Sequence, residues 1–119
     1  MGVIRRRDIQ LDESMPNLKR LTLISDEYQA GYLTFGELTI APGKSVPLHT
    51  HPTHEEGMYS LDGDLEYILG DDTGVLGKGD AMLAPAGLKH KLTNLSSEPR
   101  RVMFIFPTTN VKREVLEES

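Results

Sequence analysis

Residues 49–56 of the chain read HTHPTHEE and contain three of its four histidines, His49, His51 and His54. A strand turns alternate side chains to the same face, so His49 and His51 point the same way if this stretch is extended. Two imidazoles on one face, followed closely by a carboxylate, form the beginning of a metal site that suits Zn, Fe, Mn, Ni or Cu. Taken alone, the stretch is equally compatible with a polar surface turn.

Glycines and a fourth histidine surround this stretch at regular spacings. The first pattern reads G-x5-H-x-H-x4-E-x6-G from Gly43 to Gly63, and the second reads G-x5-P-x-G-x2-H-x3-N from Gly79 to Asn94. In this order, the two patterns resemble the paired signature motifs of the cupin superfamily. The motifs and the spacer between them cover a little under half of the chain.

The resemblance implies an all-β fold, the double-stranded β-helix or jelly-roll barrel, and it implies a set of metal ligands. Carried over position by position, the ligands are His49, His51, Glu56 and His90. His90 lies on a distant strand, so only a closed barrel brings it beside the other three. Such a set leaves positions for water, substrate or oxygen on an ion that prefers six ligands. Mn(II), Fe(II) and Ni(II) fit it best, with Zn and Cu as further candidates.

Two residues beside these positions have alternative roles. Neighbouring strand residues face opposite sides, so only one of Glu55 and Glu56 points inward, and the spacing to Gly63 selects Glu56. His54 is expected to be an exposed loop residue at the barrel mouth. The alternatives for His54 are a ligand role, or a supporting group that shuttles protons near pH 7.

The strand pattern of the whole chain agrees with a barrel. Short segments rich in β-branched and aromatic residues, separated by Gly, Pro and Asp turns, predict an antiparallel barrel or sandwich. The expected strands are 19–25, 32–40 with a bend near Gly36, 46–51, 56–61, 65–69, 75–76, 81–84, 90–94 and 101–106. Residues 1–17 are expected to form an arm, residues 18–108 the barrel domain, and residues 109–119 a charged tail with a final helical turn or two.

Two further expectations concern surfaces. The segment 102–106 is apolar at every position, so core packing and a subunit contact are expected to cover both of its faces, and the family resemblance implies a homodimer. If Glu56 faces inward, Met58, Ser60 and Leu92 line a mostly apolar pocket. A site for a small di-acid needs an inward arginine. None lies in either motif, and the facing of the flanking Arg20 and Arg101 is undecided.

Composition narrows the functional class. The 119-residue chain is expected to form one domain, and it lacks the cysteine needed for a disulfide or a thiolate metal site. Its net charge of −5 argues against general nucleic-acid binding. Its apolar runs are too short to span a membrane, and the first ten residues lack the apolar stretch of a secretory signal. A cytoplasmic protein with a small-molecule partner is therefore expected.

Three functions fit these observations. The leading hypothesis is a metal-dependent enzyme of the Fe or Mn dioxygenase type that acts on a small organic substrate. The second is a redox-neutral isomerase, lyase or decarboxylase whose ion acts as a Lewis acid. The third is a cupin that binds a small sugar or acid without changing it.

Overall fold

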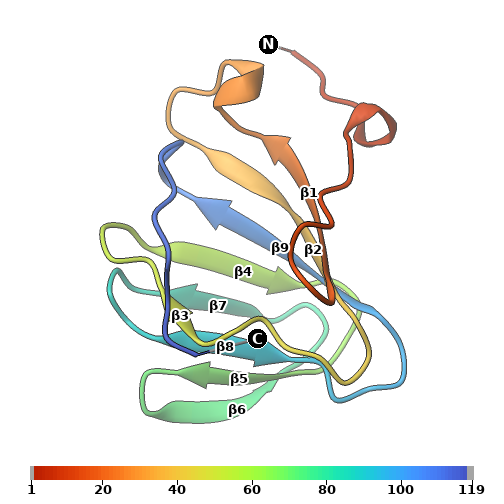
Figure 1. Ribbon diagram of the computed structural model, residues 1–119, viewed down its shortest axis with the longest axis vertical. Helices are drawn as coiled ribbons and strands as arrows, with labels where there is room; N and C mark the ends of the chain where they lie inside the picture. Colours follow the sequence, from red (N-terminus) through yellow and green to blue (C-terminus); the bar gives the residue numbers. More distant parts are fainter. Residues whose placement is uncertain (1, 118–119) are drawn as a thin grey trace.

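Two five-stranded antiparallel sheets make up the computed structural model, which describes residues 2–117 (Figure 1). The first sheet contains, in spatial order, β1 (Leu18–Ile24), β2 (Thr34–Ile40), β9 (Arg100–Phe106), β4 (Glu56–Ser60) and β7 (Ala81–Ala84). The second contains β10 (Glu114–Val115), β3 (His49–Thr50), β8 (His90–Thr93), β5 (Leu65–Leu69) and β6 (Asp72–Leu76). Two short 3-10 helices, η1 (Arg6–Asp8) and η2 (Asp26–Tyr28), complete the described elements. This arrangement confirms the predicted all-β jelly roll.

The core lies between the two sheets because the strands alternate apolar and polar side chains. On β4, Met58 and Ser60 are buried while Tyr59 between them is exposed, and on β8 Leu92 is buried. Burying a side chain of this size contributes roughly 1.5–3 kcal/mol to folding. The buried apolar cluster consists of Leu18, Ile40, Val46, Met58, Leu65, Leu76, Met82, Ala84, Leu92 and Val102.

Glycine at position 36 allows β1 and β2 to approach closely. A Cβ on Gly36 would lie 2.1 Å from the backbone oxygen of Leu21 and 2.8 Å from the ring of Phe104. The register between the strands shifts opposite this point, between Thr22 and Ile24. The expected bend near Gly36 therefore takes the form of an irregularity in the β1–β2 pairing.

The side chain of Asn94 joins three segments at the end of β8. It is fully buried, and its amide nitrogen donates to the backbone oxygens of Ile40 at 3.0 Å and Glu98 at 2.7 Å. Its oxygen accepts from the backbone N–H and the hydroxyl of Ser96 at 3.0 and 2.7 Å. A buried amide with all of these partners fixes the turn after β8 against the end of β2.

The inner face of β9 packs on the core as expected, whereas its outer face, where a subunit contact was expected, is open in the single chain. Ile105 is 39% exposed, and Tyr59 and Leu83 on the neighbouring strands are 45% and 56% exposed. With Phe35 and Met103 these residues line a shallow apolar groove on the first sheet. A homodimer that buries this groove stays a prediction.

The segment after β9 crosses from the first sheet to the second and forms the edge strand β10 (Figure 1). We call residues 107–117 the C-terminal strap. Within it, Val115 pairs with His49, and the backbone N–H of Leu116 donates to the oxygen of Leu48 at 2.8 Å. The carboxylate of Glu117 accepts from the backbone N–H of Leu48 at 3.1 Å and pairs with Lys91.

The expected helical turn in the charged tail is therefore wrong for residues up to 117, because strand pairing with β3 satisfies this backbone instead; residues 118 and 119 lie outside the described part. At the other end of the chain, the arm contains η1 and a single bridge from Asp12 to Arg20. Within residues 2–117, every helical segment is too short to cross a membrane.

Candidate metal centre

The barrel brings together four side chains that the sequence motifs selected. His49 lies on β3 and pairs directly with His90 at the start of β8, His51 follows β3, and Glu56 begins β4. All four are buried, and one potential ligand atom from each lies within 4.8 Å of the others. Glu55 is exposed, as expected for the neighbour of an inward-facing strand residue. The cluster therefore has the composition and the spacing of a metal centre.

Each of the three imidazoles is anchored through its Nδ1 atom to a backbone carbonyl. The acceptors are Pro47 for His49 at 2.7 Å, Lys112 for His51 at 2.7 Å, and Leu88 for His90 at 3.0 Å. A carbonyl oxygen can only accept, so each Nδ1 carries a proton. In the neutral ring the Nε2 atom is then a bare acceptor, which is the form that binds a metal ion.

The Glu56 carboxylate faces these acceptors. Its Oε1 lies 3.1 Å from Nε2 of His51 and 3.0 Å from Nε2 of His90. Two unprotonated nitrogens and a carboxylate oxygen repel one another at this distance unless a proton or a cation lies among them. A divalent cation satisfies all of these atoms at once, so the residues present fit a bound metal.

Burial and neighbouring charges set the protonation of this cluster. Burial lowers the pKa of His49 to about 4, and repulsion from His90 in its protonated form adds to the effect, so His49 is neutral at pH 7. Burial raises the pKa of Glu56, but hydrogen bonds and positive charge from His51 and His90 in their protonated, metal-free form outweigh it, and the pKa is lowered overall. The cluster thus presents a neutral imidazole at His49 and an ionised carboxylate, as metal binding requires.

His54 is buried, with 8% of its surface exposed, so its expected place as an exposed loop residue is wrong. Its ring stacks on that of His51 at 5.1 Å and meets Phe106 edge-on at 5.3 Å. Nδ1 donates to the backbone oxygen of Glu55, and Nε2 accepts from the backbone N–H of Lys112, both at 3.1 Å. His54 lies outside the four-residue cluster and connects His51 with the C-terminal strap, which is the reason for its burial.

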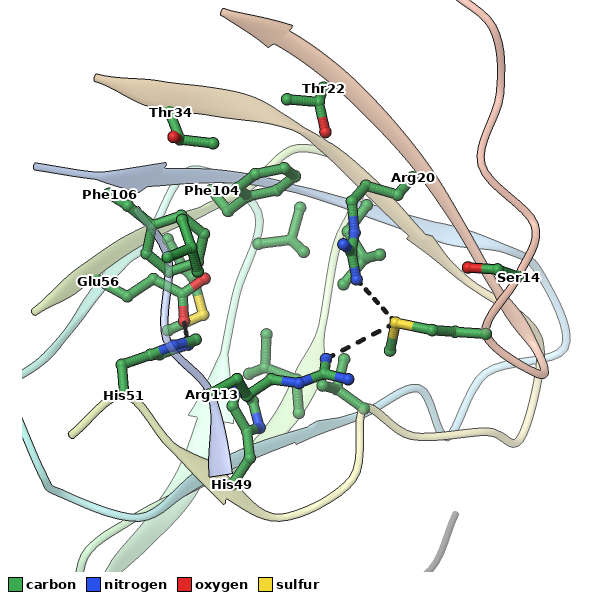
Figure 2. Close-up of a pocket in the computed structure, with 17 residues that line it drawn as sticks. Ser14, Arg20, Thr22, Thr34, His49, His51, Glu56, Phe104, Phe106 and Arg113 are labelled. Atoms are coloured by element: carbon green, nitrogen blue, oxygen red, sulfur yellow. Dashed lines mark hydrogen bonds and ion pairs between the residues drawn. The ribbon is translucent and has the colours of Figure 1, made fainter. Parts of the chain in front are cut away.

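A cavity of about 460 Å³ opens beside the cluster, with His49, His51 and Glu56 in its wall (Figure 2). This volume lies within the ordinary range for small-molecule sites. Most of the remaining wall is apolar: Met15, Leu38, Val46, Met58, Leu92, Val102, Phe104, Phe106 and Val111. Met58 and Leu92 line the cavity as expected. Ser60 is buried but donates to the backbone oxygen of Gly63 at 2.6 Å, and it lies outside the cavity lining.

The structure also settles the facing of the flanking arginines. Arg20 lines the cavity, whereas Arg101 lies outside it and pairs with Asp62 at 2.9 Å. A second arginine of the cavity, Arg113, comes from the C-terminal strap. Sequence reasoning missed Arg113 because a charged tail gives no sign of where it folds back.

Comparisons with known proteins agree with this fold. Polyketide synthase CurC of Streptomyces cyaneus is 29% identical over 111 residues, covering 87% of this chain and 71% of that protein. The structure of the polyketide cyclase RemF from Streptomyces resistomycificus superposes with a TM-score of 0.83 at 23% identity, covering 100% of this chain and 87% of that one. Bacillus subtilis oxalate decarboxylase, which has Mn(II) centres, gives a TM-score of 0.80 at 21% identity, covering 90% of this chain and 30% of that one. The sequence model of the family described as "Cupin domain" matches residues 36–106. Because this match covers more than half of the chain, the protein belongs to the cupin domain family.

Proposed function

We propose that the protein is a metal-dependent enzyme that carries out a redox-neutral reaction, of the cyclase, isomerase or lyase type, on an enolisable carbonyl compound. The observation that carries the proposal is the buried three-His, one-Glu cluster in the wall of a mostly apolar cavity. The names of CurC and RemF, a polyketide synthase and a polyketide cyclase, support the choice of substrate class. Polyketides carry alternating carbonyl and methylene groups, which enolise readily.

The proposed ligands of the ion are His49, His51, Glu56 and His90. A divalent ion held there would act as a Lewis acid that polarises a substrate carbonyl. Mn(II), Fe(II) and Ni(II) are the proposed ions, and the Mn(II) centres of oxalate decarboxylase are a precedent for the first of these in the same fold.

The protein's own residues supply orientation and an acceptor for the proton. The rings of Phe104 and Phe106 exclude water from one side of the cavity, which strengthens the electrostatic interactions inside it. Glu56 is the carboxylate of the cavity wall, and its Oε1 faces Nε2 of His51 and His90 at 3.1 and 3.0 Å, so this is the oxygen that would bind the ion. We therefore propose that a proton leaving an activated methylene group moves to Oε2 of Glu56.

The leading hypothesis from the sequence, a dioxygenase, has less support. None of the relatives reported above is described as a dioxygenase, and two are named for polyketide chemistry. A cupin that only binds a small molecule is the remaining alternative.

Anaerobic turnover separates these functions. The protein is loaded in turn with Mn(II), Fe(II) or Ni(II) and incubated with a panel of aromatic 1,3-dicarbonyl compounds under strict exclusion of oxygen. The products and the uptake of deuterium from D2O at the central carbon are then followed by NMR. We expect exchange or conversion above that of the free ion. Conversion that requires oxygen would identify a dioxygenase, and tight binding without exchange or conversion over hours would identify a binding protein.

A further inference from the structure

Two arginines from opposite ends of the chain meet on one side of the cavity (Figure 2). Arg20 extends from β1, and Arg113 extends from the C-terminal strap. Nη2 of Arg20 and Nη1 of Arg113 lie 2.7 and 3.6 Å from the same atom, Sδ of Met15. The two guanidinium groups are therefore no further apart than these two distances combined.

The atom that both guanidinium groups contact, the sulfur of Met15, is a poor hydrogen-bond partner for a positively charged group. A thioether sulfur is only a weak acceptor. In the described part of the chain, neither Arg20 nor Arg113 has a carboxylate within ion-pair distance, whereas the surface residues Arg6 and Arg101 are paired with Glu37 or Asp62. Each guanidinium group therefore has N–H donors left over for a ligand that enters the cavity.

The electrostatics of Arg113 agree with this geometry. Partial burial of the guanidinium and the nearby charge of Arg20 lower its pKa, while the negative charge of Glu56 opposes the effect. A guanidinium remains protonated at any physiological pH. The lowered pKa therefore reflects first the partial burial of a charged group and then the nearby positive charge of Arg20, and a bound anion would offset both costs.

We propose that Arg20 and Arg113 form an anion subsite that binds a carboxylate group of the substrate. The inference rests on the proposed function for the rest of the substrate and adds a feature to it: an enolisable carbonyl compound that also carries a carboxylate. Two planar guanidinium groups match a carboxylate with paired hydrogen bonds. The flexible side chain of Met15 can move aside to admit the ligand.

The subsite also orients the substrate. Figure 2 shows the guanidinium groups of Arg20 and Arg113 toward the Ser14 side of the cavity, with His51 and Glu56 on the other side beside Phe106. A carboxylate held by the arginines directs the rest of a short ligand toward the proposed metal ligands. The apolar wall between the two polar regions suits an aromatic or alkyl body.

A matched pair of ligands tests the proposal in a binding experiment that does not depend on turnover. Benzoylacetate carries the carboxylate, and its methyl ester has the same skeleton without the charge. Calorimetry on the metal-loaded protein compares both ligands in the wild type and in the variants Arg20→Gln, Arg113→Gln and Arg20→Lys. Arg7→Gln is the control, since it removes the same charge from η1, outside the cavity lining.

We expect Arg20→Gln and Arg113→Gln each to weaken benzoylacetate binding about tenfold to a hundredfold, the effect of losing hydrogen bonds to a charged group. The affinity for the ester should be almost unchanged, which also shows that the cavity of each variant is intact. Arg20→Lys should restore part of the loss, and Arg7→Gln should have no effect. Equal losses for the acid and the ester, or no loss for either, would overturn the subsite.

The two proposals can fail separately. If the arginine variants lose only benzoylacetate binding and the wild type converts no 1,3-dicarbonyl compound without oxygen, the subsite is supported and the proposed enzymatic function is contradicted. If the wild type converts neutral 1,3-dicarbonyl compounds and shows no preference for the acid, the proposed enzymatic function is supported and the anion subsite is contradicted.

Discussion

Acid should destabilise the metal-depleted protein through His49. The pKa of this imidazole is about 4 in the folded protein against 6.5 for an unperturbed histidine. Between these values the unfolded chain binds a proton that the folded protein does not bind. The contribution of His49 to stability is therefore complete above pH 6.5 and is lost progressively as the pH falls toward 4.

The two pKa values give the size of the effect. One proton bound only by the unfolded state changes the free energy of unfolding by about 1.4 kcal/mol per pH unit. Across the whole window the loss comes to about 3 kcal/mol, which is a large part of the stability of a small domain. The lowered pKa of Glu56 adds a further loss only below the ordinary carboxyl pKa of 4.5, so the range from about pH 5 to pH 6 reports on histidine.

Urea unfolding in the presence of a chelator measures this loss. The free energy of unfolding is determined at several pH values for the wild type and for His49→Gln, which retains a polar side chain but cannot titrate. We expect the wild-type curve to fall more steeply than the variant curve by up to about 1.4 kcal/mol per pH unit. Parallel curves would refute the assignment of a buried, neutral His49. Added metal should raise the stability of the wild type at pH 7, and this gain should shrink in acid as protons compete for the ligands.

Four further predictions test individual features of the fold and the site. His90→Ala should lose most of its bound metal while retaining a wild-type circular dichroism spectrum, and full metal occupancy by elemental analysis would contradict the ligand assignment. Gly36→Ala should cost at least about 3 kcal/mol in urea unfolding because its Cβ would lie 2.1 Å from a backbone oxygen, whereas Gly31→Ala, which meets nothing within 4 Å, should change little. Asn94→Leu should cost about 3 kcal/mol or more because several buried hydrogen-bonding groups lose their partner, and a smaller loss would mean that water replaces the amide. Leu83→Lys on the apolar groove should convert a dimer to a monomer in light scattering, and a monomeric wild type would remove the predicted homodimer.

The sequence predicted which four side chains the barrel brings together, largely because their placement depends on local rules. The alternation of a strand puts His49 and His51 on one face and turns Glu55 away from Glu56. The ends of the histidine strand were predicted less well, since β3 spans only His49–Thr50 of the expected 46–51. The cupin resemblance then supplied the single long-range contact that the local rules could not give, the pairing of β3 with β8 at His90.

Two errors of the sequence-based prediction, at His54 and at Arg113, have a common physical origin in the C-terminal strap. The burial of His54 and the entry of Arg113 into the cavity both require residues 107–117 to fold back over β3. This folding back depends on the backbone pairing of β10 with β3 and on the contacts of Glu117. A run of mostly charged residues carries no periodic pattern that would predict such a strand. An apolar run such as that of β9 predicts that both faces are covered, but it cannot show whether the partner of the outer face is the same chain or another one.

The hydrogen bond from His51 to the carbonyl of Lys112 also bears on how the protein is made. The acceptor is 61 residues further along the chain than the histidine that it orients. When the ribosome has just added His90, the nascent chain contains all four proposed ligands. It still lacks the carbonyl group that holds the second imidazole in place. Metal acquisition is therefore expected to be a late event in biogenesis, after synthesis has passed residue 112.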